Sequence, residues 1–307
     1  MFKCYTGCDS TFDIFELAIK VFQIQQHKEM NLNDAVRYIA IKFGMSGQYV
    51  EEAEDQMEDW TYLNNYDRIQ NIELTTNKIT KLKSYDPSIL DKFNYEVILD
   101  PWLNEGISQE VLDRARIGYY PGGAQITIPH YDADGNFVGL RGRSLCKEDA
   151  ERFGKYRPIK VNQVLYNHPL GLNLYNLNNA KKNIPIMKKA IIFEGEKSVL
   201  LYQSYFGYDA DISVACCGSN VSAFQIQCLI DAGAEEIIIA FDRQFQELGD
   251  AEFEHLKKNL LKIREKYKNF VTISFIFDKD RITGYKDSPI DCGPEIFLKL
   301  FKERIVL

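Results

Sequence analysis

From residue 189 onward, short apolar runs alternate with stretches of helical periodicity, and this alternation constrains the fold more than any other feature. The apolar runs are KAIIF, DISVACC, EEIIIAF and FVTISFIF, and the helical patterns lie at about 197–206, 222–232, 250–267 and 293–304. Each run is long enough for a buried strand, and strands alternating with helices form a parallel sheet covered on both faces. We therefore predict an α/β arrangement here, with the ligand site outside the carboxyl ends of the strands.

Acidic residues stand where two of these predicted strands end. The segment Glu194-Gly195-Glu196-Lys197-Ser198 follows the run 190–193, and Asp242-Arg243-Gln244 follows the run 237–241. Carboxylates at the ends of two parallel strands can converge, and they repel each other unless a cation binds between them. Mg²⁺ suits such a site because it takes few protein carboxylates and keeps water and phosphate oxygens as its other ligands. An acid after a strand is usually a helix cap, so the inference depends on the pair and not on either acid alone.

The preceding part of the chain mixes helices and strands. Helical spacing predicts helices over 12–23 and 31–44, and the polar segment 64–88 is predicted to be a connection. Alternation with period two predicts strands QITIPHY and NFVGLRGR, joined by a turn at 132–135. The whole chain is therefore expected to be α+β.

Charge and composition indicate which classes of protein this chain can belong to. The net charge of −7 argues against a protein that coats nucleic acid through bulk electrostatics. Charge is uneven, however: residues 51–59 are mostly acidic, whereas 141–160 is basic. This pattern is compatible with an enzyme that tracks a strand and holds cations, but charge alone favours two solvated faces. The chain has no apolar run of membrane-spanning length and no signal-peptide core, and its seven cysteines are scattered, so we expect a cytoplasmic location.

Several segments, in order, resemble one family. The segment AIIFEGEKSVL…SVACCGSNVSAFQ…EEIIIAFDRQ resembles the Toprim domain of DnaG-type bacterial and phage DNA primases. WLNEGISQEVLDRARIGYYPGG and ITIPHYDADGNFVGLRGRSL are similar to the subdomain before Toprim, and KYRPIKVNQVLYNHPLGLNLYNLNNAKK resembles the basic stretch that leads into Toprim. The beginning, MFKCYTGCDSTFDIFELAIKVFQ, resembles the second half of the primase zinc-binding domain.

The resemblance implies a division into domains. Residues 1–60 are expected to be a remnant of the zinc-binding domain plus helices, and 61–88 a linker. Residues 89–185 are expected to form the primase subdomain with the template and nucleotide groove, and 186–307 the Toprim domain with a C-terminal helix. The helicase-binding domain of such primases is expected to be missing, which hints at a phage or mobile-element protein.

The resemblance also implies a set of site residues. Glu194 and Asp242 are expected to be catalytic and to hold Mg²⁺ (or Mn²⁺), with Gln244 and Asp287 as further ligands. Arg141, Arg143, Lys155, Arg157 and Lys197 are expected to bind template and nucleotide, because guanidinium forks and ammonium groups suit phosphates. Surface charge remains an alternative for the first four, and pairing with Glu194 or Glu196 an alternative for Lys197.

The chain departs from the family at two metal sites. The second aspartate of the D-x-D motif is replaced by Gln244, for which Asp250 or Glu247 could substitute, and the later acidic motif corresponds loosely to Asp287, with Asp291 nearby. Only Cys4 and Cys8 of the zinc site are present, although a structural zinc site takes four ligands. Either the start is truncated, or another chain completes the site, or these are ordinary thiols; Zn²⁺ is expected only in a completed site.

The implied activity is Mg²⁺-dependent nucleotidyl transfer that makes short RNA primers on single-stranded DNA. A primer 3′-hydroxyl would attack the α-phosphate of a ribonucleoside triphosphate, and no protein nucleophile is required. A replicative helicase is a possible further partner, and a membrane is not. Two alternatives stay open: a Toprim nuclease, and a primase-derived protein that binds DNA or a replisome partner without catalysis.

Overall fold

The computed structural model describes residues 2–3, 11–26, 30–42 and 81–306, and the chain divides into two units, 1–82 and 83–307. The first unit contains a two-stranded antiparallel sheet, β1 (Phe2–Lys3) and β2 (Thr11–Phe12), and helices α1 (Ile14–Gln26) and α2 (Leu32–Lys42). The helices predicted at 12–23 and 31–44 are confirmed over the described positions. The acidic run 51–59 and the first part of the predicted connection, 64–80, lie outside the described residues.

Capping and aromatic packing define the two helices of the first unit. The carboxylate of Asp13 accepts hydrogen bonds from the backbone N–H groups of Phe15 and Glu16, both at 2.8 Å, and so caps α1. The rings of Phe22 and Tyr38 pack edge to face with their centroids 5.0 Å apart, which joins α1 to α2.

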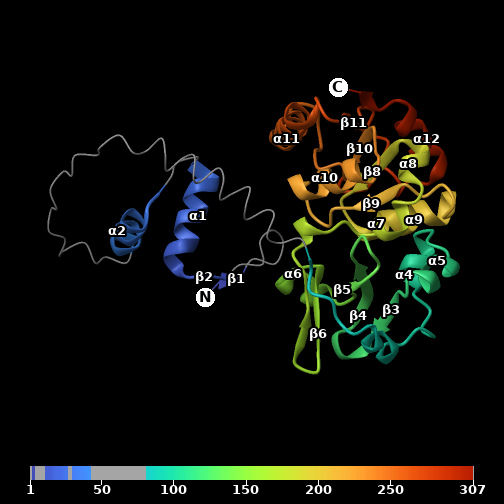
Figure 1. The fold of residues 1–307 in the computed structure, drawn as a ribbon, viewed down its shortest axis with the longest axis horizontal. Coiled ribbons are helices and arrows are strands. Elements are labelled where there is room, and N and C mark those ends of the chain that lie inside the picture. The colour runs from blue at the N-terminus through green and yellow to red at the C-terminus, as the bar shows by residue number, and fades with distance from the viewer. Residues whose placement is uncertain (1, 4–10, 27–29, 43–80, 307) are drawn as a thin grey trace. The chain divides into compact units, whose positions relative to one another are not determined.

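The second unit contains a five-stranded sheet in the C-terminal half of the chain (Figure 1). Its strands are β8 (Lys189–Phe193), β9 (Ser213–Ala215), β10 (Glu236–Ala240), β11 (Thr272–Phe275) and β12 (Ile305–Val306). The order is β12-β11-β10-β8-β9, and all neighbouring strands are parallel except the β11–β12 pair. The predicted parallel sheet is therefore confirmed, with one short antiparallel edge strand added.

Helices cover both faces of this sheet, as the alternating pattern predicts. They are α9 (Glu196–Phe206), α10 (Ala223–Asp231), α11 (Ala251–Tyr267) and α12 (Pro294–Lys302). Figure 1 shows α10 and α11 on one side and α9 and α12 on the other. Phe297 of α12 packs against Phe193 of β8 and Tyr202 of α9, with ring centroids 5.9 and 5.8 Å apart.

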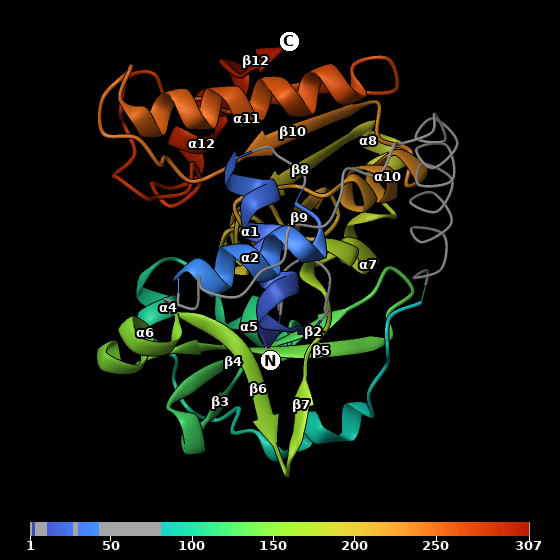
Figure 2. The same ribbon diagram turned by 90° about the vertical axis from the view of Figure 1, so that its left-hand side faces the viewer.

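A second sheet, entirely antiparallel, precedes the parallel one (Figure 2). Its strands follow chain order: β3 (Gly118–Tyr120), β4 (Gln125–Tyr131), β5 (Phe137–Ser144), β6 (Tyr156–Val161) and β7 (Val164–Tyr166). The predicted hairpin is β4–β5, with Arg141 paired to Ile128 across it. The mixed α/β fold class predicted from the sequence is thus confirmed.

Short helices connect these elements. They are η1 (Pro87–Lys92), α4 (Asp100–Asn104), α5 (Gln109–Arg114), η2 (Pro121–Gly123), α6 (Lys147–Phe153), η3 (Leu170–Leu172), α7 (Leu177–Ala180) and α8 (Ile184–Met187). None of the described helices is both long and apolar enough to cross a bilayer.

One hydrophobic core runs through both sheets of the second unit. It includes Trp102 of α4, Ile126 of β4 and Ile191 of β8, all fully or almost fully buried. A smaller cluster, with Leu90, Phe137 and Ile159, lies against the antiparallel sheet. The large shared core fixes the antiparallel sheet against the carboxyl edge of the parallel one, because packed interiors resist deformation.

Candidate metal and nucleotide site

The two acids predicted to converge lie in one cleft. Phe193, the last residue of β8, pairs with Ala240, the last residue of β10, so both strands end at the same edge. Glu194 follows β8 directly, Asp242 stands two residues after the end of β10, and both line a cleft of about 290 Å³. Basic side chains of the antiparallel sheet line it too, and we call it the acidic cleft.

Asp242 is the acid of this cleft whose pKa is raised furthest. Burial raises the pKa of Asp242 to about 7, and the negative charges of Glu194 and Asp291 add to the rise against the opposing charge of Lys197. Burial also raises the pKa of Glu194. The Oδ1 atom of Asp242 is buried without a hydrogen-bond partner among the described residues. Clustered acids and an unpartnered buried oxygen fit a divalent cation, which would satisfy the oxygen and neutralise the repulsion.

Gln244 and Asp287 sit beside this pair in different ways. The side-chain amide of Gln244 donates a hydrogen bond to Oε2 of Glu194 at 3.1 Å. The carboxylate of Asp287 accepts the backbone N–H of Gly284 at 3.0 Å, and its charge contributes to the raised pKa of Asp242. Asp291 lines the acidic cleft directly. The loop between β11 and α12 thus carries two carboxylates whose charges act on Asp242, and of the two Asp291 lines the cleft.

The alternative acid Asp250 has another role in the structure. It is the N-cap of α11, and its carboxylate accepts the backbone N–H groups of Gln246, Glu247 and Phe253 at 2.7–3.0 Å. A carboxylate that accepts several backbone hydrogen bonds at a helix start is held there. Neither Asp250 nor the exposed Glu247 lines the acidic cleft.

Of the five predicted cationic residues, Arg141, Lys155 and Lys197 line the acidic cleft. Desolvation lowers the pKa of Lys155, and the positive charges of Arg143 and Lys197 lower it further. Lys197 pairs with Glu105 at 2.6 Å and Asp291 at 2.9 Å, and not with Glu194 or Glu196 as the sequence-based alternative had it.

The remaining two arginines lie outside the residues that line the cleft. Arg143 lies 3.8 Å from Glu105, and its guanidinium carbon lies 5.9 Å from the ring centroid of Trp102. Arg157 lies 3.4 Å from Asp149 on α6. Cys4 and Cys8, the predicted partial zinc site, lie outside the described residues.

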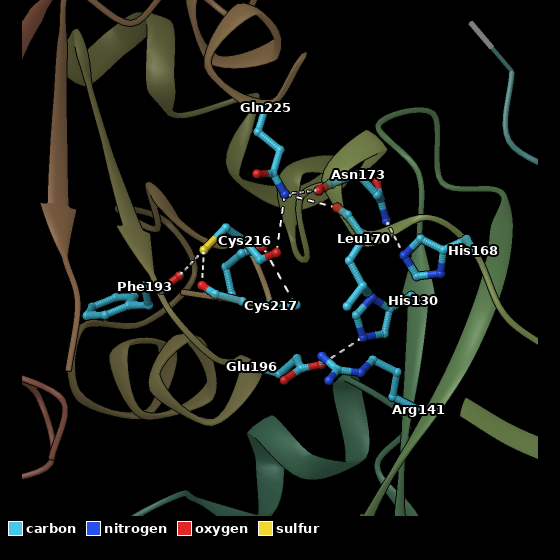
Figure 3. Close-up of polar contacts among 12 residues, drawn as sticks. His130, Arg141, His168, Leu170, Asn173, Phe193, Glu196, Cys216, Cys217 and Gln225 are labelled. Atoms are coloured by element: carbon cyan, nitrogen blue, oxygen red, sulfur yellow. Dashed lines mark hydrogen bonds and ion pairs between the residues drawn. The ribbon is translucent and has the colours of Figure 1, made fainter. Parts of the chain in front are cut away.

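Sequence reasoning missed a buried ion pair that joins α9 to the antiparallel sheet (Figure 3). Glu196, in the first turn of α9, is 1% exposed; its Oε1 accepts a hydrogen bond from Arg141 at 2.6 Å and lies 3.0 Å from Nε2 of His130. Burial alone would raise the pKa of Glu196, but the Arg141 guanidinium and His130 hold it well below its ordinary value. Burial lowers the pKa of His130, so the imidazole is neutral and donates from Nε2.

Cys217 completes this buried cluster. His130, Glu196 and Cys217 offer ligand atoms within 4.8 Å of one another, a proximity of a histidine and a cysteine that the sequence did not reveal. Burial and the charge of Glu196 raise the pKa of the Cys217 thiol well above its usual range, so it stays protonated. Because the carboxylate is already neutralised by Arg141, the cluster is satisfied without a metal ion.

Comparison with known sequences identifies a relative that matches nearly the whole chain. No family model matches the chain. The SPbeta prophage-derived uncharacterized protein YorJ of Bacillus subtilis is 35% identical over 320 residues, which cover 99% of this chain and 82% of that protein.

Solved structures of primases share the fold at low sequence identity. The DnaG primase catalytic domain bound to single-stranded DNA matches with a TM-score of 0.54 and 18% identity, over 71% of this chain and 77% of that one. The Aquifex aeolicus primase, with its zinc-binding and RNA polymerase domains, matches with a TM-score of 0.54 and 17% identity, over 94% of this chain and 71% of that one. The second unit therefore has the fold of a primase catalytic core.

Proposed function

The chain belongs to the family of the SPbeta prophage-derived protein YorJ, and from this premise we propose that it is a DNA primase. In this proposal it makes short RNA primers on single-stranded DNA by Mg²⁺-dependent nucleotidyl transfer. The observation that carries the proposal is the convergence of Glu194 and Asp242, with an unpartnered Asp242 oxygen, in a cleft walled by Arg141 and Lys155. The primase fold supports it.

The acids of the cleft would hold the cation. Glu194 and Asp242 are the main ligands, with Asp291 or Asp287 completing the set and Gln244 orienting Glu194 through its hydrogen bond. A bound Mg²⁺ would activate the attacking 3′-hydroxyl and neutralise charge on the transferred phosphate. Lys155 and Arg141 would contact the phosphates of nucleotide and template, because both cations line the same cleft as the acids.

The domain assignment is part of the same proposal. Residues 89–185 would form the template and nucleotide groove, and residues 186–307 the Toprim domain. Single-stranded DNA and ribonucleoside triphosphates would be the partners, and a replicative helicase a further one. The zinc site at Cys4 and Cys8 stays a prediction.

A second candidate is a primase-derived protein that binds DNA without catalysis. Gln244 favours it, because a neutral amide replaces a carboxylate beside Glu194 and so reduces the attraction for a dication. A nuclease on the same module would share the metal site and differ in its products.

One assay separates these functions. Purified protein would be incubated with labelled ribonucleoside triphosphates and a single-stranded DNA template, with Mg²⁺ or with EDTA. We expect labelled oligoribonucleotides only with Mg²⁺, and none from Glu194→Gln, while the exposed control Glu247→Gln retains synthesis. Template cleavage without synthesis would support a nuclease, and DNA binding without either product would support the binding protein.

A further inference from the structure

A second cavity of about 290 Å³ lies apart from the acidic cleft and shares none of its lining residues within the described chain. It is bounded by the end of α5, the end of β4 and the segment that contains α7, with Gln203 of α9 and Tyr208 completing the wall. Figure 1 shows α5 beside α9 in this part of the unit. We call it the arginine pocket, after Arg114 and Arg116.

The charge of the arginine pocket is positive in a chain of net charge −7. Two arginines line it, and no aspartate or glutamate is among its described lining residues. Arg114 has no carboxylate partner in the described part of the chain, and its guanidinium stacks 3.6 Å from the ring centroid of Tyr208. Arg116 pairs with Asp91 at 2.5 Å, but the side chains are 40% and 70% exposed, and such exposed pairs contribute little. Both guanidinium groups are therefore available to bind an anion.

The wall of the arginine pocket is preorganised. The side-chain amides of Asn176 and Gln203 each donate a hydrogen bond of 2.8 Å to Oδ2 of the buried Asp211, which fixes both residues. A fixed wall lowers the entropic cost of ligand binding. The hydroxyl of Tyr208 is buried with no hydrogen-bond partner among the described residues, and an unpartnered buried group of this kind indicates a missing ligand or water.

Aromatic surface accompanies the positive charge. Tyr131, Tyr175 and Tyr208 all line the cavity. Guanidinium groups bind phosphate with paired hydrogen bonds, and tyrosine rings stack on nucleobases whatever their sequence. The absence of carboxylates among the described lining residues disfavours metal cations and amines.

We propose that the arginine pocket binds a free mononucleotide, with its phosphate at Arg114 and Arg116 and its base against Tyr131, because the ring of Tyr175 is buried and that of Tyr208 is covered by Arg114. This site would be separate from the acidic cleft and would need no metal ion. Its existence does not depend on primase activity, because its residues take no part in the proposed catalysis.

Isothermal titration of the full chain with AMP and with GMP, in EDTA, tests the proposal. EDTA removes the cation that would hold a nucleotide in the acidic cleft, and the heat that is lost when Arg114 and Arg116 are replaced reports the arginine pocket. We expect both nucleotides to bind, and adenosine and inorganic phosphate to bind more weakly than AMP. Combined Arg114→Ala and Arg116→Ala substitutions should weaken AMP binding at least about tenfold, because charge-assisted hydrogen bonds are lost.

Lys160→Ala is the matched control, because it removes an exposed cation of the same unit on β6, and it should leave AMP binding unchanged. Arg114→Lys with Arg116→Lys keeps the charge and should bind AMP more tightly than the double alanine variant. Thermal unfolding monitored by circular dichroism checks that each variant is folded. The proposal is overturned if wild type binds neither nucleotide in EDTA, or if a folded double alanine variant binds AMP like wild type. It is also overturned if the double alanine change weakens the binding of a single-stranded oligonucleotide but leaves the binding of AMP unchanged.

Discussion

Asp242 keeps its proton to near-neutral pH when no cation is bound, because it is buried beside other acids. Its pKa is raised from 3.8 to about 7, so between these pH values the folded protein binds more protons at this group than the unfolded chain does. Stability contributed by Asp242 therefore falls as the pH rises from about 4 to about 7. A metal ion would reverse this penalty, since it favours the charged form.

Asp242→Asn should make the metal-free protein more stable at pH 8. The amide cannot ionise, so the variant avoids a penalty that is on the order of a few kcal/mol. Urea unfolding in EDTA at pH 4 and pH 8 measures the difference, which should appear only at the higher pH. Glu247→Gln, at an exposed position, is the control and should leave the free energy of unfolding unchanged at both pH values. A wild type as stable as Asp242→Asn at pH 8 would contradict the assigned environment.

The contribution of Glu196 to stability depends on pH in the opposite sense to that of Asp242. Its pKa is lowered in the folded state, so the stability it contributes is present above its ordinary pKa and is lost as the pH falls toward the folded value. Glu196→Gln leaves the guanidinium of Arg141, only 14% exposed, without a counter-charge. We expect the free energy of unfolding at pH 7 to fall by about 3 kcal/mol, as for other broken buried pairs.

Glu295→Gln is the matched control for Glu196→Gln. Glu295 also lies in the first turn of a helix, α12, but it is exposed. Its replacement removes the interaction with the helix dipole alone, which is worth about 0.5 kcal/mol. Equal losses in the two variants, measured by urea unfolding, would show that the buried ion pair adds nothing.

Helices were more predictable than short strands, and the caps explain why. Periodicity predicts helices at 222–232 and 250–267, and the structure has Ala223–Asp231 and Ala251–Tyr267, each begun by a capping side chain. By contrast β3, β7 and β12 have two or three residues each, too few for any periodicity to show.

The site was predictable only where its chemistry is local in sequence. Glu194 and Asp242 each follow an apolar strand, so their meeting follows from parallel topology. The partners of Glu196 are 66 and 55 positions away, at His130 and Arg141, and Lys197 lies 92 positions from Glu105. No local pattern specifies such pairs, because they depend on how the antiparallel sheet packs on the parallel one.

The capping box of α10 provides a test at the level of one element. Ser222 accepts the backbone N–H of Gln225 at 3.0 Å, and the Gln225 side chain accepts the backbone N–H of Ser222 at 2.9 Å. Ser222→Ala should lower the free energy of unfolding by about 1 kcal/mol. Ser219→Ala, at an exposed position in the loop before α10, should leave it unchanged. Thermal or urea unfolding measures the stability of both variants. A Ser222→Ala variant as stable as wild type would exclude a capping role.

Over the whole molecule, a net charge of −7 must be overcome locally for a nucleic acid to bind. Arg141 is a poor site for testing this, because its removal would leave Glu196 buried and unpaired. Lys155 lines the same cleft and forms no ion pair with another described residue. It can therefore be removed without breaking a buried pair.

Lys155→Ala should weaken single-stranded DNA binding and flatten its salt dependence. Each lost phosphate contact reduces the slope of log K against log salt by about 0.7 for a single strand. Fluorescence anisotropy with a labelled oligonucleotide at several salt concentrations measures the slope. Lys160→Ala, on the exposed face of β6, should keep the wild-type slope. An unchanged slope in Lys155→Ala would place the strand elsewhere.

The Mg²⁺ dependence of primer synthesis tests the central claim most directly, measured side by side for wild type, Gln244→Asp and Asp242→Asn. We expect saturable dependence in wild type. Half-maximal activity should come at a lower Mg²⁺ concentration in Gln244→Asp, because an added carboxylate beside Glu194 strengthens the attraction for a dication. Asp242→Asn should make no primers at any Mg²⁺ concentration. Primer synthesis by Asp242→Asn with the wild-type Mg²⁺ dependence would contradict the account.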